Sequence, residues 1–351
     1  MLQKLLSALY STRLMALLFI GFAAAMAAGT FIEDAYNTET ARILVYNTWW
    51  FEAIMVFFVI NFFGNIKRYQ LYKKEKWATL LLHLSFIFII IGAFVTRYIS
   101  YEGLMPIREG AISNTVYSDM PHLTTFVDGE YQGEMKRKTI ENQLLLSQAV
   151  NNSFSYSDKF SDIPYKIELQ EFIMNASQTF KPNAKGDLYI KLVEASGGSR
   201  KEHFLRDGEV KNISNVLFAF NKFTQGAVNI SKIAEAYTIQ TPFDGNFMRM
   251  ADKFQGTISK DKASPLMFRS LYNAGGSQFV FPELAQNGEV VLASNNDYKD
   301  KKTDDAIVVK VTSQNKEEIV TLMGSKGKQG EPKSFKIGKL DFTLMYGSKV
   351  H

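Results

Sequence analysis

Long apolar runs divide this chain of 351 residues into two parts. Three of them, residues 14–32, 49–66 and 78–96, approach the roughly 20 apolar residues that a helix needs to cross a hydrocarbon core about 30 Å thick. After residue 97 the apolar runs are short, and polar residues, glycine and asparagine separate them. The pattern predicts an α-helical membrane anchor with three transmembrane helices over residues 1–97 and a water-soluble domain over residues 98–351.

The charged residues between the runs indicate how the anchor is oriented. The connection "KRYQLYKKEK" (67–76) carries five positive charges and one negative charge, whereas "EDAYNTETARILVYN" (33–47) is net acidic. Short loops rich in Lys and Arg stay in the cytoplasm. We therefore predict a multi-pass protein of the cytoplasmic (inner) membrane, with a cytoplasmic amino terminus and its large domain on the extracytoplasmic, periplasmic side.

A second interpretation of the first run stays open. The charged start, the apolar stretch and "AAAMAAG" (23–29) also fit a secretory signal that is cleaved after Ala25-Met26-Ala27. Against a signal, the apolar stretch is long, and Gly21, Ala25 and Gly29 form a stripe of small residues that lets another helix approach closely. Either interpretation leaves the large domain on the same side of the membrane.

Two polar residues within the runs carry the chemical interest. His83 lies seven residues after Lys76, which is about 10 Å along a helix. Asn61 lies six residues before Lys67 on the neighbouring, antiparallel run, which is about 9 Å from the same membrane face. Ionisable groups such as His83 are rare inside a membrane and mark paths of substrates, ions or cofactors. The alternative is that His83 only forms a hydrogen bond that fixes helix packing. We predict that the two residues meet, with Asn61 orienting the imidazole.

Residues 98–351 show the pattern of a mainly β extracytoplasmic domain. Short segments rich in β-branched and aromatic residues occur at 187–194, 215–220, 278–284, 288–294 and 306–313. Turn signals separate them, among them Asp128-Gly129, Asp207-Gly208 and Asn287-Gly288. The pattern predicts an antiparallel sandwich or open barrel, with short helices at 138–149 and 229–236. The last strand pair ends with the chain, so we expect this domain to be incomplete at its carboxyl terminus.

Catalytic chemistry is scarce outside the apolar runs. The chain has no cysteine, so it contains no disulfide, thiolate metal site or cysteine nucleophile. His122 and His203 are isolated from other metal-binding residue types in the sequence, and we interpret both as ordinary histidines. The Lys and Arg residues that flank the apolar runs account for the whole net charge of +5, so the basic composition does not indicate a nucleic-acid partner.

Four segments in order resemble one known family. These are "NTWWFE" (47–52), "NFFGNIKR" (61–68), "HLSFIFIIIGAF" (83–94) and "EGLMPIREG" (102–110). Together they resemble the ResB/CcsB type of cytochrome c biogenesis protein of System II, in the form fused to its partner in Bacteroidetes-like bacteria. The resemblance is strong to about residue 125 and looser beyond it, and it favours retention of the first apolar run.

The resemblance implies a subunit that helps bind and export haem and present it to apocytochrome c for covalent attachment. His83 matches the family's intramembrane histidine, which makes it a candidate axial ligand of the haem iron, with Asn61 as a candidate supporting residue. The implied cofactor is b-type haem in transit, shared with a CcsA-like membrane subunit or fused domain that carries a WWD motif. A thiol-reducing, thioredoxin-like protein is a further implied partner.

The sequence also departs from the family's complete complex. It contains no WWD-type haem-binding segment, because "TWWFE" is an interfacial tryptophan pair followed by Phe and Glu. We therefore expect an accessory part of a cytochrome c synthase complex that is not catalytic by itself. The alternative is a membrane-tethered extracytoplasmic binding or scaffold protein with no haem role.

Overall fold

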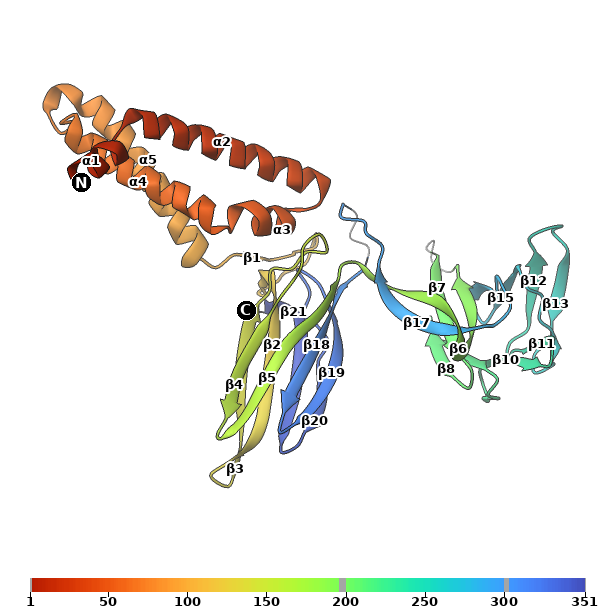
Figure 1. The fold of residues 1–351 in the computed structure, drawn as a ribbon. Coiled ribbons are helices and arrows are strands. Elements are labelled where there is room, and N and C mark those ends of the chain that lie inside the picture. The colour runs from red at the N-terminus through yellow and green to blue at the C-terminus, as the bar shows by residue number, and fades with distance from the viewer. Residues whose placement is uncertain (1, 196–199, 300–302, 351) are drawn as a thin grey trace. The chain divides into compact units, whose positions relative to one another are not determined.

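The computed structural model describes residues 2–195, 200–299 and 303–350, and these form two compact units. The first, here called the helix-bearing unit, comprises Met1–Ala176 and Ser294–His351. The second, the inserted unit, comprises Ser177–Ala293. The chain therefore leaves the first unit after strand β5 and returns to it before strand β18 (Figure 1).

Three helices in the helix-bearing unit are long and apolar enough to cross a membrane, as the sequence predicted. They are α2 (Thr12–Ala35), α4 (Trp49–Arg68) and α5 (Trp77–Tyr98). Shorter helical segments are α1 (Leu2–Leu9), α3 (Thr38–Ala41), a π-helical turn at Arg42–Tyr46 and a 3₁₀ turn at Lys74–Lys76. Ser11 begins α2, because its hydroxyl oxygen accepts the backbone N–H of Leu14 at 3.1 Å.

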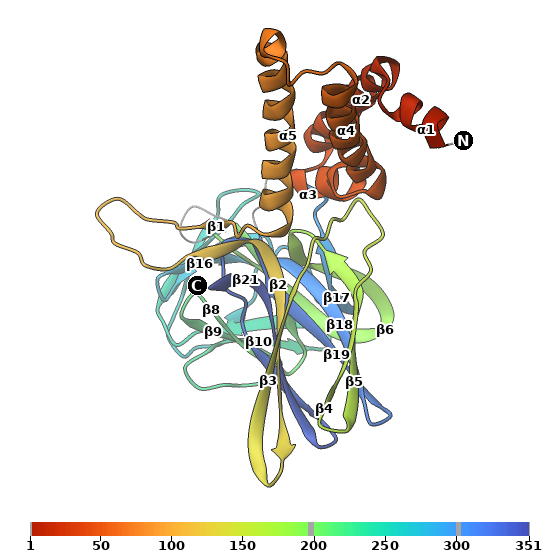
Figure 2. The ribbon, with the colours of Figure 1, turned by 90° about the vertical axis from the view of Figure 1, so that its left-hand side faces the viewer.

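The three long helices lie side by side (Figures 1 and 2). Their shared core is formed by Leu18, Phe58, Phe62 and Ile87. Gly29 on α2, a member of the predicted stripe of small residues, and Gly64 on α4 each permit a close contact. A Cβ on Gly29 would lie 2.3 Å from the Tyr46 hydroxyl oxygen, and a Cβ on Gly64 would lie 1.9 Å from the Tyr10 ring.

Two antiparallel sheets complete the helix-bearing unit. One has the order β1 (Gly103–Leu104), β2 (Tyr117–Tyr131), β21 (Leu340–Val350) and β20 (Lys333–Ile337), and β3 (Glu134–Gln143) pairs with β2. The other has the order β19 (Lys316–Gly324), β18 (Asp305–Ser313), β5 (Ile163–Ile173) and β4 (Ser155–Phe160). Apolar residues of both sheets share one core, in which the Tyr165 and Phe342 rings lie 5.7 Å apart. This arrangement is a sandwich of open sheets and no closed barrel, within the predicted class.

The inserted unit also contains two sheets around one core. The larger follows the order β13 (Gln255–Ile258), β12 (Gly245–Arg249), β15 (Ser270–Ala274), β16 (Ser277–Val280), β6 (Ala176–Glu194) and β17 (Gln286–Ser294), with β7 (Lys201–Arg206) beside β6. The smaller follows β14 (Ser264–Pro265), β11 (Ala236–Gln240), β10 (Val228–Ile233), β9 (Val216–Phe220) and β8 (Val210–Ile213). One pair departs from the antiparallel pattern, since β9 and β10 run parallel, with Phe218 opposite Val228.

Two local predictions were wrong. The expected helix at 138–149 is strand β3 as far as Gln143, and the expected helix at 229–236 is strand β10 followed by the turn into β11. In both places hydrogen bonds to a neighbouring strand override the local helical pattern.

The turn signals had mixed outcomes. Asp207-Gly208 is a turn, and Gly208 takes a φ of +76° there. Asn287-Gly288 instead lies within β17, where a Cβ on Gly288 would meet the Lys181 carbonyl oxygen at 2.5 Å. This glycine permits a close approach of two strands and forms no turn. Asp128-Gly129 likewise lies within β2.

Candidate functional site

His83 lies on α5, half-buried beside α4. Its Nδ1 atom is 2.9 Å from the Thr79 carbonyl oxygen one turn earlier. The Phe62 ring meets the imidazole edge-on, with 5.6 Å between ring centroids. When the Nδ1 N–H donates to that carbonyl oxygen, the imidazole lone pair lies on Nε2. Nε2 is then the atom that could coordinate a metal.

A groove of about 560 Å³ opens beside His83 on the helical surface, and we call it the His83 groove. Phe62 and Phe86 form part of its wall and stack with 5.3 Å between centroids. Lys76 also lines it, and the Lys76 ammonium donates to the Tyr69 carbonyl oxygen at 2.7 Å. The groove therefore combines aromatic walls, one imidazole and one cation.

Asn61 is fully buried in α4, but its hydrogen-bond partners do not include His83. Its Nδ2 atom donates to the carbonyl oxygens of Leu9 and Ser11 at 2.6 and 3.1 Å. Asn61 thus satisfies carbonyl groups where α1 joins α2. In the described part of the chain no hydrogen bond connects Asn61 with His83.

Asn65 was missed at the sequence level. It follows Asn61 by one helical turn, is 3% exposed and lines the His83 groove. Its Nδ2 donates to the Asn61 Oδ1 at 2.6 Å, whereas its own Oδ1 is buried without a hydrogen-bond partner among the described residues. The spacing of two asparagines by four residues in an apolar run was the available signal, because such residues share a helix face.

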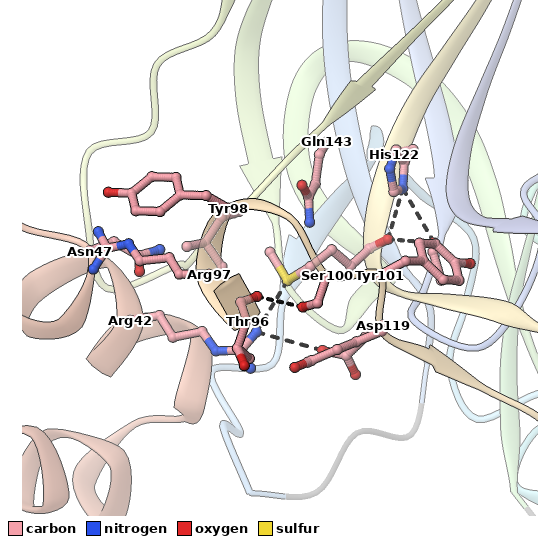
Figure 3. A pocket seen from close by; sticks show the side chains of 14 residues that line it. Arg42, Asn47, Thr96, Arg97, Tyr98, Ser100, Tyr101, Asp119, His122 and Gln143 are labelled. Carbon is pink, nitrogen blue, oxygen red and sulfur yellow. Dashed lines mark hydrogen bonds and ion pairs between the residues drawn. The ribbon is translucent and has the colours of Figure 1, made fainter. Parts of the chain in front are cut away.

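A second pocket of about 550 Å³ lies where the helical segments meet strand β2 (Figure 3), and we call it the junction pocket. Arg97 is held by the Glu52 carboxylate and donates to the Tyr46 carbonyl oxygen at 2.7 Å. The Arg42 guanidinium lies 3.6 Å from the Asp119 carboxylate. Because both arginines have acidic partners, the pocket is polar without a strong excess of either charge.

The remaining candidate histidines have local polar partners. His122 lines the junction pocket, and its Nδ1 lies 2.9 Å from the Met120 carbonyl oxygen. In the inserted unit, the His203 Nε2 atom is 3.4 Å from the buried Glu194 carboxylate. Burial lowers the pKa of His203, and the Glu194 carboxylate opposes that shift. Across the described ranges, no three His, Asp or Glu side chains gather as a metal site.

Comparison with known proteins finds a similarity over part of the chain. Over 123 residues, 35% of this chain, the sequence is 41% identical to Protein NrfI from Wolinella succinogenes. The matched part covers 13% of NrfI, so the chain corresponds to a small fraction of that longer protein. No family model matches the chain. The protein thus combines three membrane-spanning-capable helices, a mainly β remainder and a segment similar to NrfI.

Proposed function

We propose that this chain is a membrane subunit of a cytochrome c biogenesis complex. In this proposal it binds haem at the His83 groove, helps to carry it across the cytoplasmic membrane and presents it to apocytochrome c. The observation that carries the proposal is a histidine on a membrane-spanning-capable helix that lines an aromatic-walled groove together with a lysine. The ResB/CcsB resemblance and the similarity to NrfI support the same role.

The groove residues fit a haem. A volume of about 560 Å³ lies within the range of about 300–1,000 Å³ typical of cofactor sites. The His83 imidazole is a suitable iron ligand, and the rings of Phe62 and Phe86 offer apolar surface to a porphyrin. Lys76 supplies a cation for a propionate. The Asn65 Oδ1, which has no hydrogen-bond partner in the described part of the chain, can accept a hydrogen bond from a bound water or a protonated propionic acid.

In this proposal His83 would supply one ligand to the haem iron, and a CcsA-like membrane subunit or fused domain with a WWD motif would supply the remainder of the site. A thioredoxin-like protein would keep the apocytochrome thiols reduced. In this proposal the chain contributes haem binding and positioning, and the thioether bonds join the haem to cysteines of apocytochrome c. Its amino terminus is proposed to be cytoplasmic and its β units periplasmic.

The test is haem retention by the full chain purified together with a CcsA-like partner. The wild-type complex should show a Soret band, and His83→Ala should lose most of it because the iron loses a ligand. His83→Cys should retain haem with a thiolate-type spectrum, which a purely structural histidine would not produce. His203→Ala, altered in the inserted unit, is the matched control and should leave the band unchanged. An unchanged band in His83→Ala would remove the ligand role.

A membrane-tethered binding or scaffold protein is the second candidate. The polar junction pocket favours it, because most of the residues that line this pocket, and the two β sheets of each unit, lie outside the three long helices. Replacing the three helices by an unrelated membrane anchor distinguishes the candidates. Cytochrome c maturation should stop if the helices handle haem, and it should continue if they only anchor the protein.

A further inference from the structure

Apolar side chains are exposed along the segment that follows α5. This segment, residues 99–116, contains the two-residue strand β1 and the loop that joins β1 to β2. Ile112 is 100% exposed, and Ile107 is 55% exposed. The other exposed apolar or aromatic residues of the segment are Ile99, Tyr101, Leu104 and Met105. Exposed apolar residues gathered within one short segment indicate a surface that something apolar covers.

The place of this segment in the chain indicates what covers its apolar side chains. It begins directly after Tyr98, the last residue of a membrane-spanning-capable helix. Pairing of Gly103 with Ser118 and of Leu104 with Tyr117 closes the loop at its base. Figure 2 shows the loop running sideways from the foot of α5 before the chain returns to β2. A segment that runs across the direction of α5 can lie along the surface of a bilayer that α5 crosses.

The composition of the segment suits the lipid interface. Its charged residues are Glu102, Arg108 and Glu109, so little charge has to leave water. Arg108 follows Ile107 directly, and a long arginine side chain can reach the headgroups while its neighbour enters the acyl boundary. Tyr98 and Tyr101 are exposed aromatic residues of the kind found at that boundary.

We propose that residues 99–116 form a lipid-contacting loop, whose Leu104, Met105, Ile107 and Ile112 side chains enter the bilayer at the end of α5. The loop attaches the first sheet of the helix-bearing unit to the membrane surface, because β1 pairs with β2. This role rests on the membrane helices and is independent of haem binding.

The absence of cysteine permits a direct test on the full chain. Single-cysteine variants Ile107→Cys and Ile112→Cys are labelled with an environment-sensitive fluorophore and reconstituted in phospholipid vesicles. Phe94→Cys, near the end of α5, is the lipid-exposed reference. Ile319→Cys, at an exposed position of β19 in the same unit, is the water-exposed reference. Each probe is quenched with aqueous iodide and, separately, with lipids that carry a spin label near the headgroup.

The loop probes should emit at shorter wavelength than the Ile319 probe. They should also be quenched several-fold more by the spin-labelled lipid and several-fold less by iodide. Iodide quenching equal to that of the Ile319 probe would overturn the proposal. Shielding from both quenchers would also overturn it, because protein would then cover the loop. Met105→Cys gives a third position, and circular dichroism of each variant confirms that the fold is retained.

Discussion

The helical segments and the β units use the same apolar residue types in opposite ways. Along α5 the buried residue is Ile87, while Phe88, Ile89 and Phe94 are exposed. In the sheets, Phe218, Phe279 and Phe342 are nearly or completely buried. Apolar surface is driven out of contact with water, but it is not driven out of contact with lipid hydrocarbon. A membrane helix can therefore keep apolar side chains on its outer face. The difference indicates which part of the chain has water as its solvent.

Polar groups sharpen the same contrast. The β units carry charged pairs at their surface, such as Asp128 with Arg137. The helices instead enclose Asn61 and Asn65, whose amides bond to each other and to backbone carbonyls. An unsatisfied polar atom costs more in hydrocarbon than at a wet surface. Among the described residues, buried polar atoms without a hydrogen-bond partner occur in both parts of the molecule, for example the Asn65 Oδ1 and the Thr125 hydroxyl. The Asn65 atom lies in an apolar helix, where the cost is larger and a ligand can satisfy it.

The largest expected effect is in a β core. Phe342→Ala removes a fully buried ring that lies 5.7 Å from the rings of Tyr165 and Phe335. The free energy of unfolding should fall by about 3–5 kcal/mol, measured by urea unfolding of the sheet circular dichroism signal in detergent. Ile319→Ala, at an exposed position of β19, is the control and should change it little. Equal effects of the two changes would contradict the assigned core.

A smaller effect is expected where the helices bury a polar group. Asn61→Leu removes the donor to the Leu9 and Ser11 carbonyl oxygens and the acceptor of the Asn65 amide. Unpaired buried groups should lower helix stability by about 1–3 kcal/mol, measured by thermal unfolding in lipid vesicles. Haem retention should also weaken, though less than in His83→Ala. Wild-type haem loading in Asn61→Leu would argue against a supporting role at His83.

A pH-dependent effect is expected between the two sheets of the helix-bearing unit. Hydrogen bonds from Lys138 and then Tyr156 lower the pKa of Asp158 to about 2. Because this folded-state pKa lies below the unfolded value of about 3.9, the stabilisation is full above pH 4 and is lost as the pH falls toward 2.

Asp158→Asn tests the ion pair of Asp158 with Lys138, which joins β3 to β4. At pH 7 the variant should be less stable than the wild type by about 1 kcal/mol, since the carboxylate is partly exposed to solvent. The difference should shrink as the pH approaches 2, followed by urea unfolding at several pH values. A constant difference across that range would show that the carboxylate charge is not its cause.

The smallest effect is expected on the outer face of α5. Phe88→Ala changes a side chain that is 67% exposed. Lipid replaces the lost ring, so thermal stability in vesicles should change by no more than about 0.5 kcal/mol. A loss comparable to that of Phe342→Ala would show that Phe88 packs against another protein helix in the membrane.

Sequence patterns predicted the three long helices and several of the strands, because these elements depend on local periodicity. The expected spans 14–32, 49–66 and 78–96 all fall within α2, α4 and α5. Strands were predicted at 187–194, 288–294 and 306–313, and β6, β17 and β18 occupy those positions. The inserted unit was not predicted, since the chain enters and leaves it at the ends of the continuous strands β6 and β17, without a marked linker.

The candidate site shows the same limit. His83 stands out in the sequence because an ionisable residue in an apolar run is expensive, whatever it contacts. The sequence does not show which asparagine lies near His83, since Asn61 and Asn65 share one face of their helix. Only the packing of α1 and α2 against α4 assigns Asn61 to the Leu9 and Ser11 carbonyls and places Asn65 in the groove.

The sequence by itself determined which segments are helices long enough for a membrane, where several of the strands lie, and which residue within an apolar run is chemically unusual. These properties follow from residue type and spacing along one segment. The tertiary structure decided that β18 pairs with β5 across an inserted unit, that β9 and β10 run parallel, and that Asn65 lines the groove of His83. Such pairings depend on which distant segments meet, and that choice is made by packing and hydrogen bonding of the whole chain.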